Sequence, residues 1–325
     1  MASVFRKQAA VSYRYPHHEE ALEAASSALE KYRSLDDVVG MAEASYWKGC
    51  SLMMLNKEDD AVPILEKAHG IFQAEDDHVG VFKCLERLGE LQRRKGDIAG
   101  ALLRLQDAVT LASSHGDKLG EARALLPLGS AYLQSDNIEN NIEEGTSTLL
   151  TACQVARNIG WCHGLCVALS RLGTVNTRNG AYQEAERYFQ ESISVAREAS
   201  ARLRVAQSLS QLGECFRTQE RLDEAAEKFE EACCVFYEIS FAGRDFVFAA
   251  SAYAAVQRRR GSTQDAIFWY DQAIFKCQYL KDAYAVSWHL REKAEALLEL
   301  GWYDEAALNF EASIVVRMES GVIAV

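Results

Sequence analysis

Arginine residues recur at comparable places along the chain and are its clearest candidates for binding chemistry. Guanidinium groups bind carboxylates and phosphates through paired hydrogen bonds, so a regular series of them indicates an acidic or phosphorylated ligand. Repeated at a fixed pitch, such groups would stack as a ladder. The candidate binding residues, two of which lie beside the series, are Arg93, Arg94, Arg123, Arg171, Arg178, Arg217, Arg258 and Arg259.

The same series has a second explanation that needs no ligand. Each arginine stands near the expected end of a helix, where the helix dipole favours a cation by roughly 0.3–1 kcal/mol. Repeated helix ends would repeat that preference. Ligand binding and helix-end electrostatics therefore both stay open at this point.

A metal site is the other chemistry that the residue spacing suggests. Cys162, His163 and Cys166 lie close together, but a zinc site needs about four ligands and no second pair stands at a matching spacing. We therefore expect small buried side chains here, with no metal and no cofactor. Nine cysteines without a disulfide framework favour a reducing compartment and a cytoplasmic protein.

Motifs of enzymes and of other protein classes are missing from the sequence. It contains no phosphate-binding loop, dinucleotide fingerprint or HExxH pair, so we expect no enzymatic activity. The formal charge of 35 − 47 = −12 argues against a nucleic-acid binder. The longest apolar stretch, Phe246–Val256, is too short to cross a membrane and predicts a buried helix.

Small residues recur every 40 to 44 positions along the chain. They are Ala9, Gly49, Gly89, Gly129, Gly173, Gly213, Ala254 and Ala294. Twelve residues later a second small residue follows, at Ala21, Ala61, Ala101, Ala185, Ala225, Ala266 and Ala306. Four residues after most of these comes a large one, at Leu65, Leu105, Phe189, Phe229, Tyr270 and Phe310.

A period of this length is typical of a helical solenoid. Each unit is predicted to hold two helices, in which the small residues let two backbones approach while the large residue fills the gap. With three prolines in 325 residues the chain favours helix throughout. Four aspartates are predicted N-caps of first helices: Asp37, Asp77, Asp117 and Asp282.

This pattern of small, alanine, large and small residues resembles the tetratricopeptide repeat. The 40-residue period is similar to the extended variant of kinesin light chains, Pins-type adaptors and signalling sensor arrays. The resemblance implies an all-α, right-handed superhelical solenoid of about eight antiparallel helix hairpins, as one unit over residues 1–325. The hairpins are expected at about 1–34, 35–74, 75–115, 116–158, 159–199, 200–240, 241–280 and 281–325.

The resemblance also implies a concave groove, lined by the first helices, that binds a protein or peptide partner as a scaffold or adaptor. The asparagine of a chaperone-tail clamp is absent from the groove, where Cys50, Glu90, Ser130, Thr174 and Glu214 stand. The other expected groove positions are Glu43, Tyr46, Met53, Lys83, Glu86, Arg93, Ser170, Thr177, Gln207, Ser210, Arg217, Phe248, Ser251, Ala255 and Arg258.

Two other functions stay open. A ligand-sensing regulatory module would use a hinge at Pro127 and at the four extra residues within 135–141. An RNA-binding repeat would use the arginines, although the net charge opposes it. The last helix is followed by no polar capping helix, so either the chain is cut from a longer array or its end packs on another surface. Our hypothesis is self-association through the C-terminal hairpin.

Overall fold

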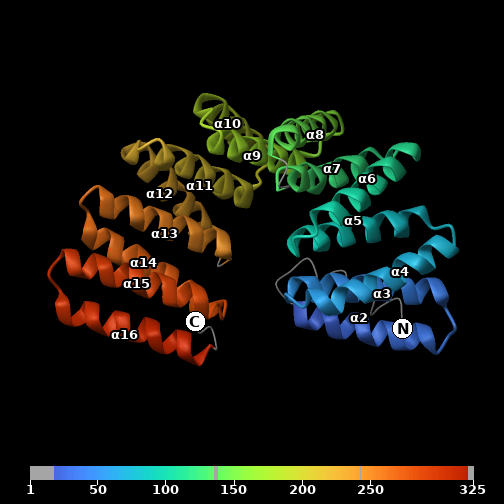
Figure 1. The fold of residues 1–325 in the computed structure, drawn as a ribbon, viewed down its shortest axis with the longest axis horizontal. Coiled ribbons are helices and arrows are strands. Elements are labelled where there is room, and N and C mark those ends of the chain that lie inside the picture. The colour runs from blue at the N-terminus through green and yellow to red at the C-terminus, as the bar shows by residue number, and fades with distance from the viewer. Residues whose placement is uncertain (1–17, 135–137, 242, 321–325) are drawn as a thin grey trace. The chain divides into compact units, whose positions relative to one another are not determined.

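The computed structural model describes residues 18–134, 138–241 and 243–320, with side chains from residue 141 on in the middle segment (Figure 1). Ala9 and part of the extra segment within 135–141 lie outside the described residues. All secondary structure in the described segments is α-helical, which confirms the fold class. The helices are α2 (His18–Arg33), α3 (Val38–Met54), α4 (Glu58–Ala74), α5 (His78–Arg94), α6 (Ile98–Ser114), α7 (Lys118–Tyr132), α8 (Ile138–Asn158), α9 (Cys162–Arg178), α10 (Tyr182–Glu198), α11 (Arg202–Thr218), α12 (Leu222–Glu238), α13 (Arg244–Arg259), α14 (Thr263–Tyr279), α15 (Ala283–Glu299) and α16 (Tyr303–Glu319).

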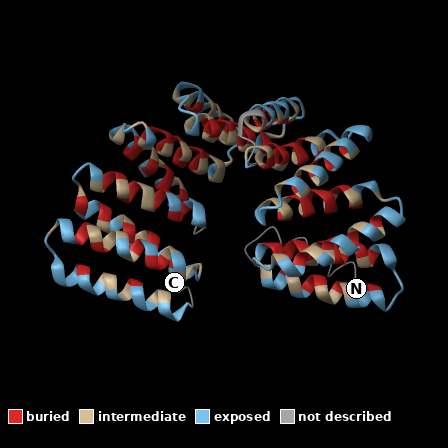
Figure 2. Cartoon of the chain, in the orientation of Figure 1, coloured by how far each residue is buried: buried red, intermediate tan, exposed pale blue. Residues whose placement is uncertain are grey.

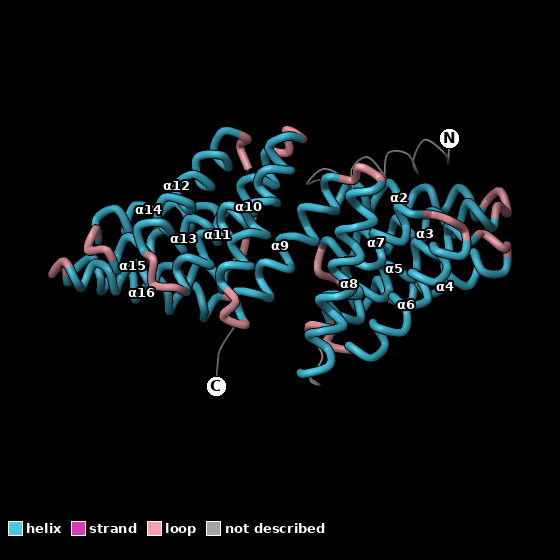
Figure 3. The backbone as a smooth tube through the Cα atoms, turned by 90° about the horizontal axis from the view of Figure 1, so that it is seen from above, coloured by secondary structure: helices cyan, strands magenta, loops and turns pink. Residues whose placement is uncertain are grey.

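Each hairpin expected from residue 35 onward contains two of these helices, and short loops join them (Figure 3). Helices that follow one another in sequence pack together, as α3 does with α4 and α11 with α12. The chain separates into two compact units, Met1–Gly164 and Leu165–Val325. A single cooperative unit over the whole chain therefore stays a prediction.

The turns between helices share one backbone feature, a residue with positive φ, about every 20 residues. A single residue with positive φ follows each helix from α2 to α15 other than α7, and it is a glycine in turns such as Gly96 (φ 84°), Gly180 (φ 75°) and Gly261 (φ 84°). Glycine adopts this left-handed conformation without the steric cost of a Cβ atom. These glycines therefore allow the chain to turn directly after a helix.

All four predicted aspartate caps are confirmed. The side chains of Asp37, Asp77, Asp117 and Asp282 each accept a hydrogen bond from a backbone N–H in the first turn of α3, α5, α7 or α15. The contact from Gly40 N to Asp37 Oδ1 measures 2.8 Å. Each cap satisfies a backbone donor that has no partner inside the helix.

The repeat anchors pack as pairs between the two helices of a hairpin. A Cβ atom placed on Gly49 would lie 2.5 Å from Leu65, and one on Gly173 would lie 2.6 Å from the ring of Phe189. The alanines that follow, including Ala61, are fully buried. The remaining anchors occupy equivalent places in their hairpins: Gly89, Ala101, Gly129, Ala185, Gly213, Ala225, Ala254, Ala266, Ala294 and Ala306.

Two helix-interior glycines should respond to alanine in opposite directions. Gly173→Ala is expected to destabilise the chain by about 1–3 kcal/mol, because the new methyl group overlaps the enclosed ring of Phe189. Gly70→Ala, in α4, meets no atom within 4 Å and should stabilise by up to about 1 kcal/mol through helix propensity. Urea unfolding of both variants checks this. A Gly173→Ala protein as stable as the wild type would contradict the packing account.

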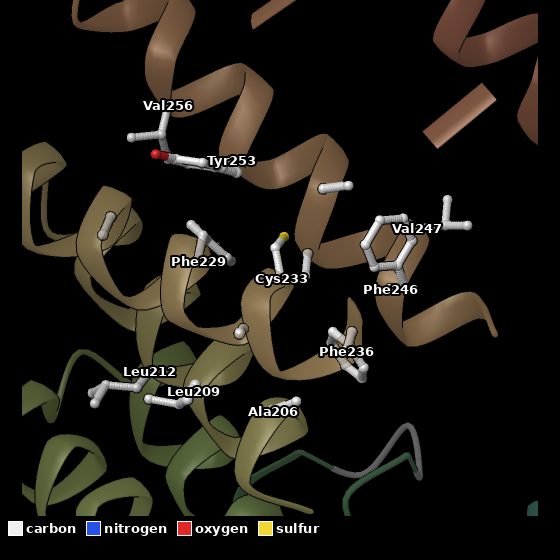
Figure 4. Packing of buried hydrophobic residues seen from close by; sticks show 14 of the residues in the cluster. Ala206, Leu209, Leu212, Phe229, Cys233, Phe236, Phe246, Val247, Tyr253 and Val256 are labelled. Atoms are coloured by element: carbon white, nitrogen blue, oxygen red, sulfur yellow. The ribbon is translucent and has the colours of Figure 1, made fainter. Parts of the chain in front are cut away.

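Buried side chains line the contacts between successive helices, and exposed ones face away from them (Figure 2). In the second unit, α12 lies between α11 and α13. Phe229, Cys233 and Phe236 of α12 point toward neighbours such as Tyr253 and Phe246 of α13 (Figure 4). This continuous core holds α11 and α13 at the fixed spacing on which the site described below depends.

His289, in α15, should make stability depend on pH. The side chain is 7% exposed and its buried Nδ1 has no hydrogen-bond partner among the described residues. Burial lowers the pKa of His289 to about 4, against about 6.5 in the unfolded chain. Between these values the unfolded state binds more protons, so this contribution is lost as the pH falls from 6.5 to 4. Urea midpoints at pH 7 and pH 5 should therefore differ less in His289→Leu than in wild type. Equal pH dependence in both proteins would contradict this.

Candidate groove site

The second unit contains a cavity of about 670 Å³, walled by α9, α11 and the start of α13, with two residues from α10. Fourteen of its 17 lining residues carry a hydroxyl, amide or charged group. The lining residues are Val167, Ser170, Arg171, Thr174, Thr177, Arg178, Tyr182, Phe189, Arg204, Gln207, Ser208, Ser210, Gln211, Glu214, Thr218, Asp245 and Phe248.

Helical spacing explains why these side chains converge. On α9, Val167, Ser170, Thr174 and Thr177 recur at three- and four-residue steps, which place them on one face of a helix. The groove positions that the family resemblance indicated are prominent in the cavity wall. They are Ser170, Thr174, Thr177, Gln207, Ser210, Glu214 and Phe248.

A chain of polar contacts leads from the first turns of α11 to the start of α13. Arg204 Nη1 donates to Gln207 Oε1 at 2.8 Å, and Gln207 Nε2 donates to Asp245 Oδ2 at 2.6 Å. Burial lowers the pKa of Arg204, since the charged form is poorly solvated there. The carboxylate of Asp245 is thus already a hydrogen-bond acceptor within the wall.

The other acidic group of the cavity is also paired. Glu214 accepts two hydrogen bonds from Arg217, at 2.7 and 2.6 Å. By contrast, Arg178 is exposed and forms no ion pair or hydrogen bond with any described residue. Gln211 Oε1 is buried and has no hydrogen-bond partner among the described atoms. The cavity therefore presents one unpaired cation and one unused acceptor.

Serine hydroxyls form the polar base of the cavity. Ser192 Oγ, fully buried, lies 2.8 Å from Ser208 Oγ and donates to the backbone oxygen of Cys166 at 3.2 Å. Ser170 Oγ lies 3.3 Å from Ser208 Oγ. Ser170 and Ser208 also line the cavity, so they offer hydroxyl groups to a bound polar ligand.

In the first unit the predicted arginines are paired with carboxylates. Arg93 and Arg94 both donate to Glu90, at 2.8 and 3.1 Å, and Arg123 donates to Glu86 at 2.5 Å. Burial raises the pKa of Glu90, but the hydrogen bonds from these arginines outweigh it and hold the pKa below its usual value. The carboxylates at these expected groove positions are therefore neutralised within the chain.

The second unit divides the predicted arginines into two groups. Arg217, Arg258 and Arg259 each pair with a glutamate, as Arg258 Nε does with Glu299 at 2.7 Å. Arg171 and Arg178 instead line the cavity. At least six of the eight arginines thus have carboxylate partners, and the structure brings Arg171 and Arg178 to the cavity wall.

Arg204 and Asp245 were absent from the sequence-based list. Each lies near the beginning of the first helix of its hairpin, whereas the predicted arginines lie near helix ends. One signal was available, since Arg204 stands three residues before the groove position Gln207 and so shares its helix face.

The other chemical candidates have ordinary surroundings. Cys166 is buried and its Sγ lies 3.6 Å from the backbone oxygen of Ser192, while Cys162 is exposed. Within residues 18–134, 138–241 and 243–320, no three His, Cys, Asp or Glu side chains are grouped so that they could hold a metal ion. None of the described helices has the length and hydropathy to cross a membrane.

Comparisons with known proteins agree with this geometry. The family model for the tetratricopeptide repeat matches residues 164–235, which include α11 and almost all of α9. None of the curated protein sequences matches the chain.

Solved structures of similar fold extend over nearly the whole chain. One is a Rap protein complexed with competence and sporulation factor, with a TM-score of 0.61, 13% identity and 98% of each chain covered. The quorum sensor NprR from B. thuringiensis has a TM-score of 0.65 at 13% identity, over 96% of this chain and 87% of NprR.

A third is a signal-transduction ATPase with a tetratricopeptide repeat sensor, from Pyrococcus horikoshii. It has a TM-score of 0.69 and 13% identity, over 99% of this chain and 49% of that chain. At these identities the similarity establishes a shared fold.

Proposed function

Residues 164–235 are a tetratricopeptide repeat segment within a chain of that fold. From this premise we propose that the chain acts as a protein-interaction module. Its ligand is a short peptide segment that carries an acidic or phosphorylated side chain and binds in the cavity of α9, α11 and α13. The single observation that carries this proposal is the unpaired Arg178 in a cavity whose two acidic residues are already hydrogen-bonded.

The cavity chemistry suits each part of such a peptide. An anionic group would be bound by Arg178, with Arg171 two turns earlier on the same helix face. The unused oxygen of Gln211 would accept a backbone N–H of the peptide. Phe248, 44% exposed, offers an apolar surface to a neighbouring side chain. The volume lies within the range of about 300–1,000 Å³ that is usual for ligand pockets.

Peptide panels test this function directly. Fluorescein-labelled peptides of matched sequence, differing only in serine, phosphoserine, glutamate or lysine at one position, would be titrated against the full chain in about 0.15 M salt. We expect the phosphoserine and glutamate peptides to bind at least tenfold more tightly than the serine peptides. Preference for the lysine peptides, or equal affinity for all four kinds, would contradict the proposal.

A second candidate is a ligand-sensing regulatory module. The position of α9 in the chain supports this candidate. The helix supplies one cavity wall, and its residues fall in both compact units, which divide at Gly164. Solved proteins of this fold include a quorum sensor and a sensor-bearing ATPase. Small-angle scattering of the chain with and without a bound peptide separates the two candidates. Altered dimensions support the sensor, and unchanged dimensions support a passive scaffold.

A further inference from the structure

The second helix of every hairpin exposes two outward positions that are seven residues apart. They are exposed in all eight second helices, so they face solvent throughout the described chain. In the first six of these helices they hold charged, polar or small residues, with one exception at Leu103. These residues are Glu23 and Glu30, Pro63 and Gly70, Leu103 and Thr110, Ser147 and Gln154, Arg187 and Ser194, and Glu227 and Cys234.

The last two second helices, α14 and α16, differ at both positions. Phe268 and Phe275 of α14 are 55% and 62% exposed, and Leu308 and Val315 of α16 are 64% and 50% exposed. A seven-residue step returns to the same helix face, and both helices pack against α15. These four side chains define the outer apolar patch. Scattered exposed apolar residues are normal, but these four repeat at equivalent outward positions on the second helices of neighbouring hairpins.

Acidic residues flank this patch in the same register on both helices. Asp265 and Asp271 stand three residues before and after Phe268, as Glu305 and Glu311 do around Leu308, so they are its neighbours on the helix surface. Asp271 is paired with Lys293 at 2.7 Å. The other three form no ion pair with any described residue.

The two cations of these helices contact aromatic rings and form no ion pair with a described residue. The ammonium of Lys276 lies 5.6 Å from the ring centroid of the patch residue Phe275 and 5.9 Å from that of Phe246. The guanidinium of Arg317 lies 5.9 Å from the ring centroid of Tyr284. Three unpaired carboxylates therefore outnumber these two cations, and the net unpaired charge of the two helices at these places is negative.

We propose that the outer apolar patch is a docking surface for a basic amphipathic helix of a partner protein. The apolar side of such a helix covers the two rows of the patch, and its flanking lysines or arginines pair with Asp265, Glu305 and Glu311. A second copy of this chain brings the same acidic flanks, so like charges would meet. The outer apolar patch shares no residue with the cavity of α9, α11 and α13. The protein would therefore bind one partner at the patch and another in the cavity.

The probe is a fluorescein-labelled helical peptide of leucine and lysine, with leucine at i, i+3, i+4 and i+7. A counterpart with glutamate in place of lysine is the ligand control. The full chain is compared with the variant F268E/F275S/L308E/V315S. Its glutamates and serines are residue types that other second helices already have at the equivalent positions, as at Glu227 and Ser194. The matched control is L103E, which changes the exposed apolar residue at the same place in α6.

We expect the fourfold variant to bind the lysine peptide at least tenfold more weakly at about 0.15 M salt, and L103E to bind within twofold of wild type. A second variant, D265N/E305Q/E311Q, keeps the apolar surface and should lose most of the salt dependence. Arg178→Glu should bind this helix as wild type does, which separates the surface from the groove.

Three results would overturn the proposal. They are unchanged affinity in the fourfold variant, equal binding of the glutamate peptide, and a wild-type dimer in light scattering that the fourfold variant converts to monomer. The last result would assign the patch to a second copy and would support the self-association that the sequence predicts for the C-terminal hairpin.

Discussion

Phe229→Ala is expected to lower the free energy of unfolding by about 3–5 kcal/mol. The ring is fully buried, and a Cβ atom on Gly213 would lie 3.1 Å from it, so the ring packs directly on the backbone of α11. It also meets Phe248 of α13 edge to face, with centroids 6.4 Å apart. Truncation leaves a void between the two helices that wall the cavity, and helices held from both sides cannot close it fully.

Urea unfolding followed by circular dichroism measures this loss. Phe229→Leu is the control, since leucine already fills the equivalent place at Leu65 and Leu105 and should cost much less. If the two compact units unfold separately, only one of two transitions should shift, whereas one cooperative unit would shift as a whole. A loss below about 1 kcal/mol for the alanine variant would contradict the packing account.

Arg178→Glu is expected to weaken binding of an acidic or phosphorylated peptide by roughly 10- to 100-fold. Hydrogen bonds to charged groups contribute about 1.5–3 kcal/mol, and each 1.4 kcal/mol corresponds to a factor of ten. Because the side chain is exposed and has no partner among the described residues, the substitution removes no internal contact. The loss should therefore appear in affinity while the melting temperature stays within a few degrees.

The control is Arg187→Glu, another exposed arginine, on the outward face of α10, which pairs with the exposed Glu184 at 2.7 Å. It changes the net charge by the same amount, so it reports any general electrostatic effect of the reversal. Affinity should stay within about twofold of wild type, and raising the salt should weaken binding to the wild type more than to Arg178→Glu. Equal losses in both variants would assign the effect to net charge and contradict a localised site.

The repeat architecture was predictable because its causes are local in sequence. The anchor pair Gly173 and Phe189 and the cap Asp77 depend on fixed spacings within one hairpin, and these can be counted along the chain. The expected groove positions followed from the resemblance to the tetratricopeptide repeat. Residues such as Ser170 and Gln207 therefore line the cavity as the resemblance implied.

The ion pairs of the arginines were harder to predict from the sequence. Arg217 with Glu214 is a three-residue pair within one helix and could have been found from spacing alone. Arg258 with Glu299 joins neighbouring hairpins, and its geometry depends on how their helix ends align. The division into two compact units likewise depends on packing between hairpins, which the nearly uniform 40-residue period does not encode.

The central claim is that Arg178 binds an anionic side chain of a peptide in the cavity. A double-mutant cycle tests it most directly, with phosphoserine and serine versions of one peptide titrated against wild type and Arg178→Glu. The account predicts a coupling free energy of at least about 1.5 kcal/mol between the phosphate and Arg178. Additive effects, within about 0.5 kcal/mol, would show that the two groups do not interact and would contradict the proposed site.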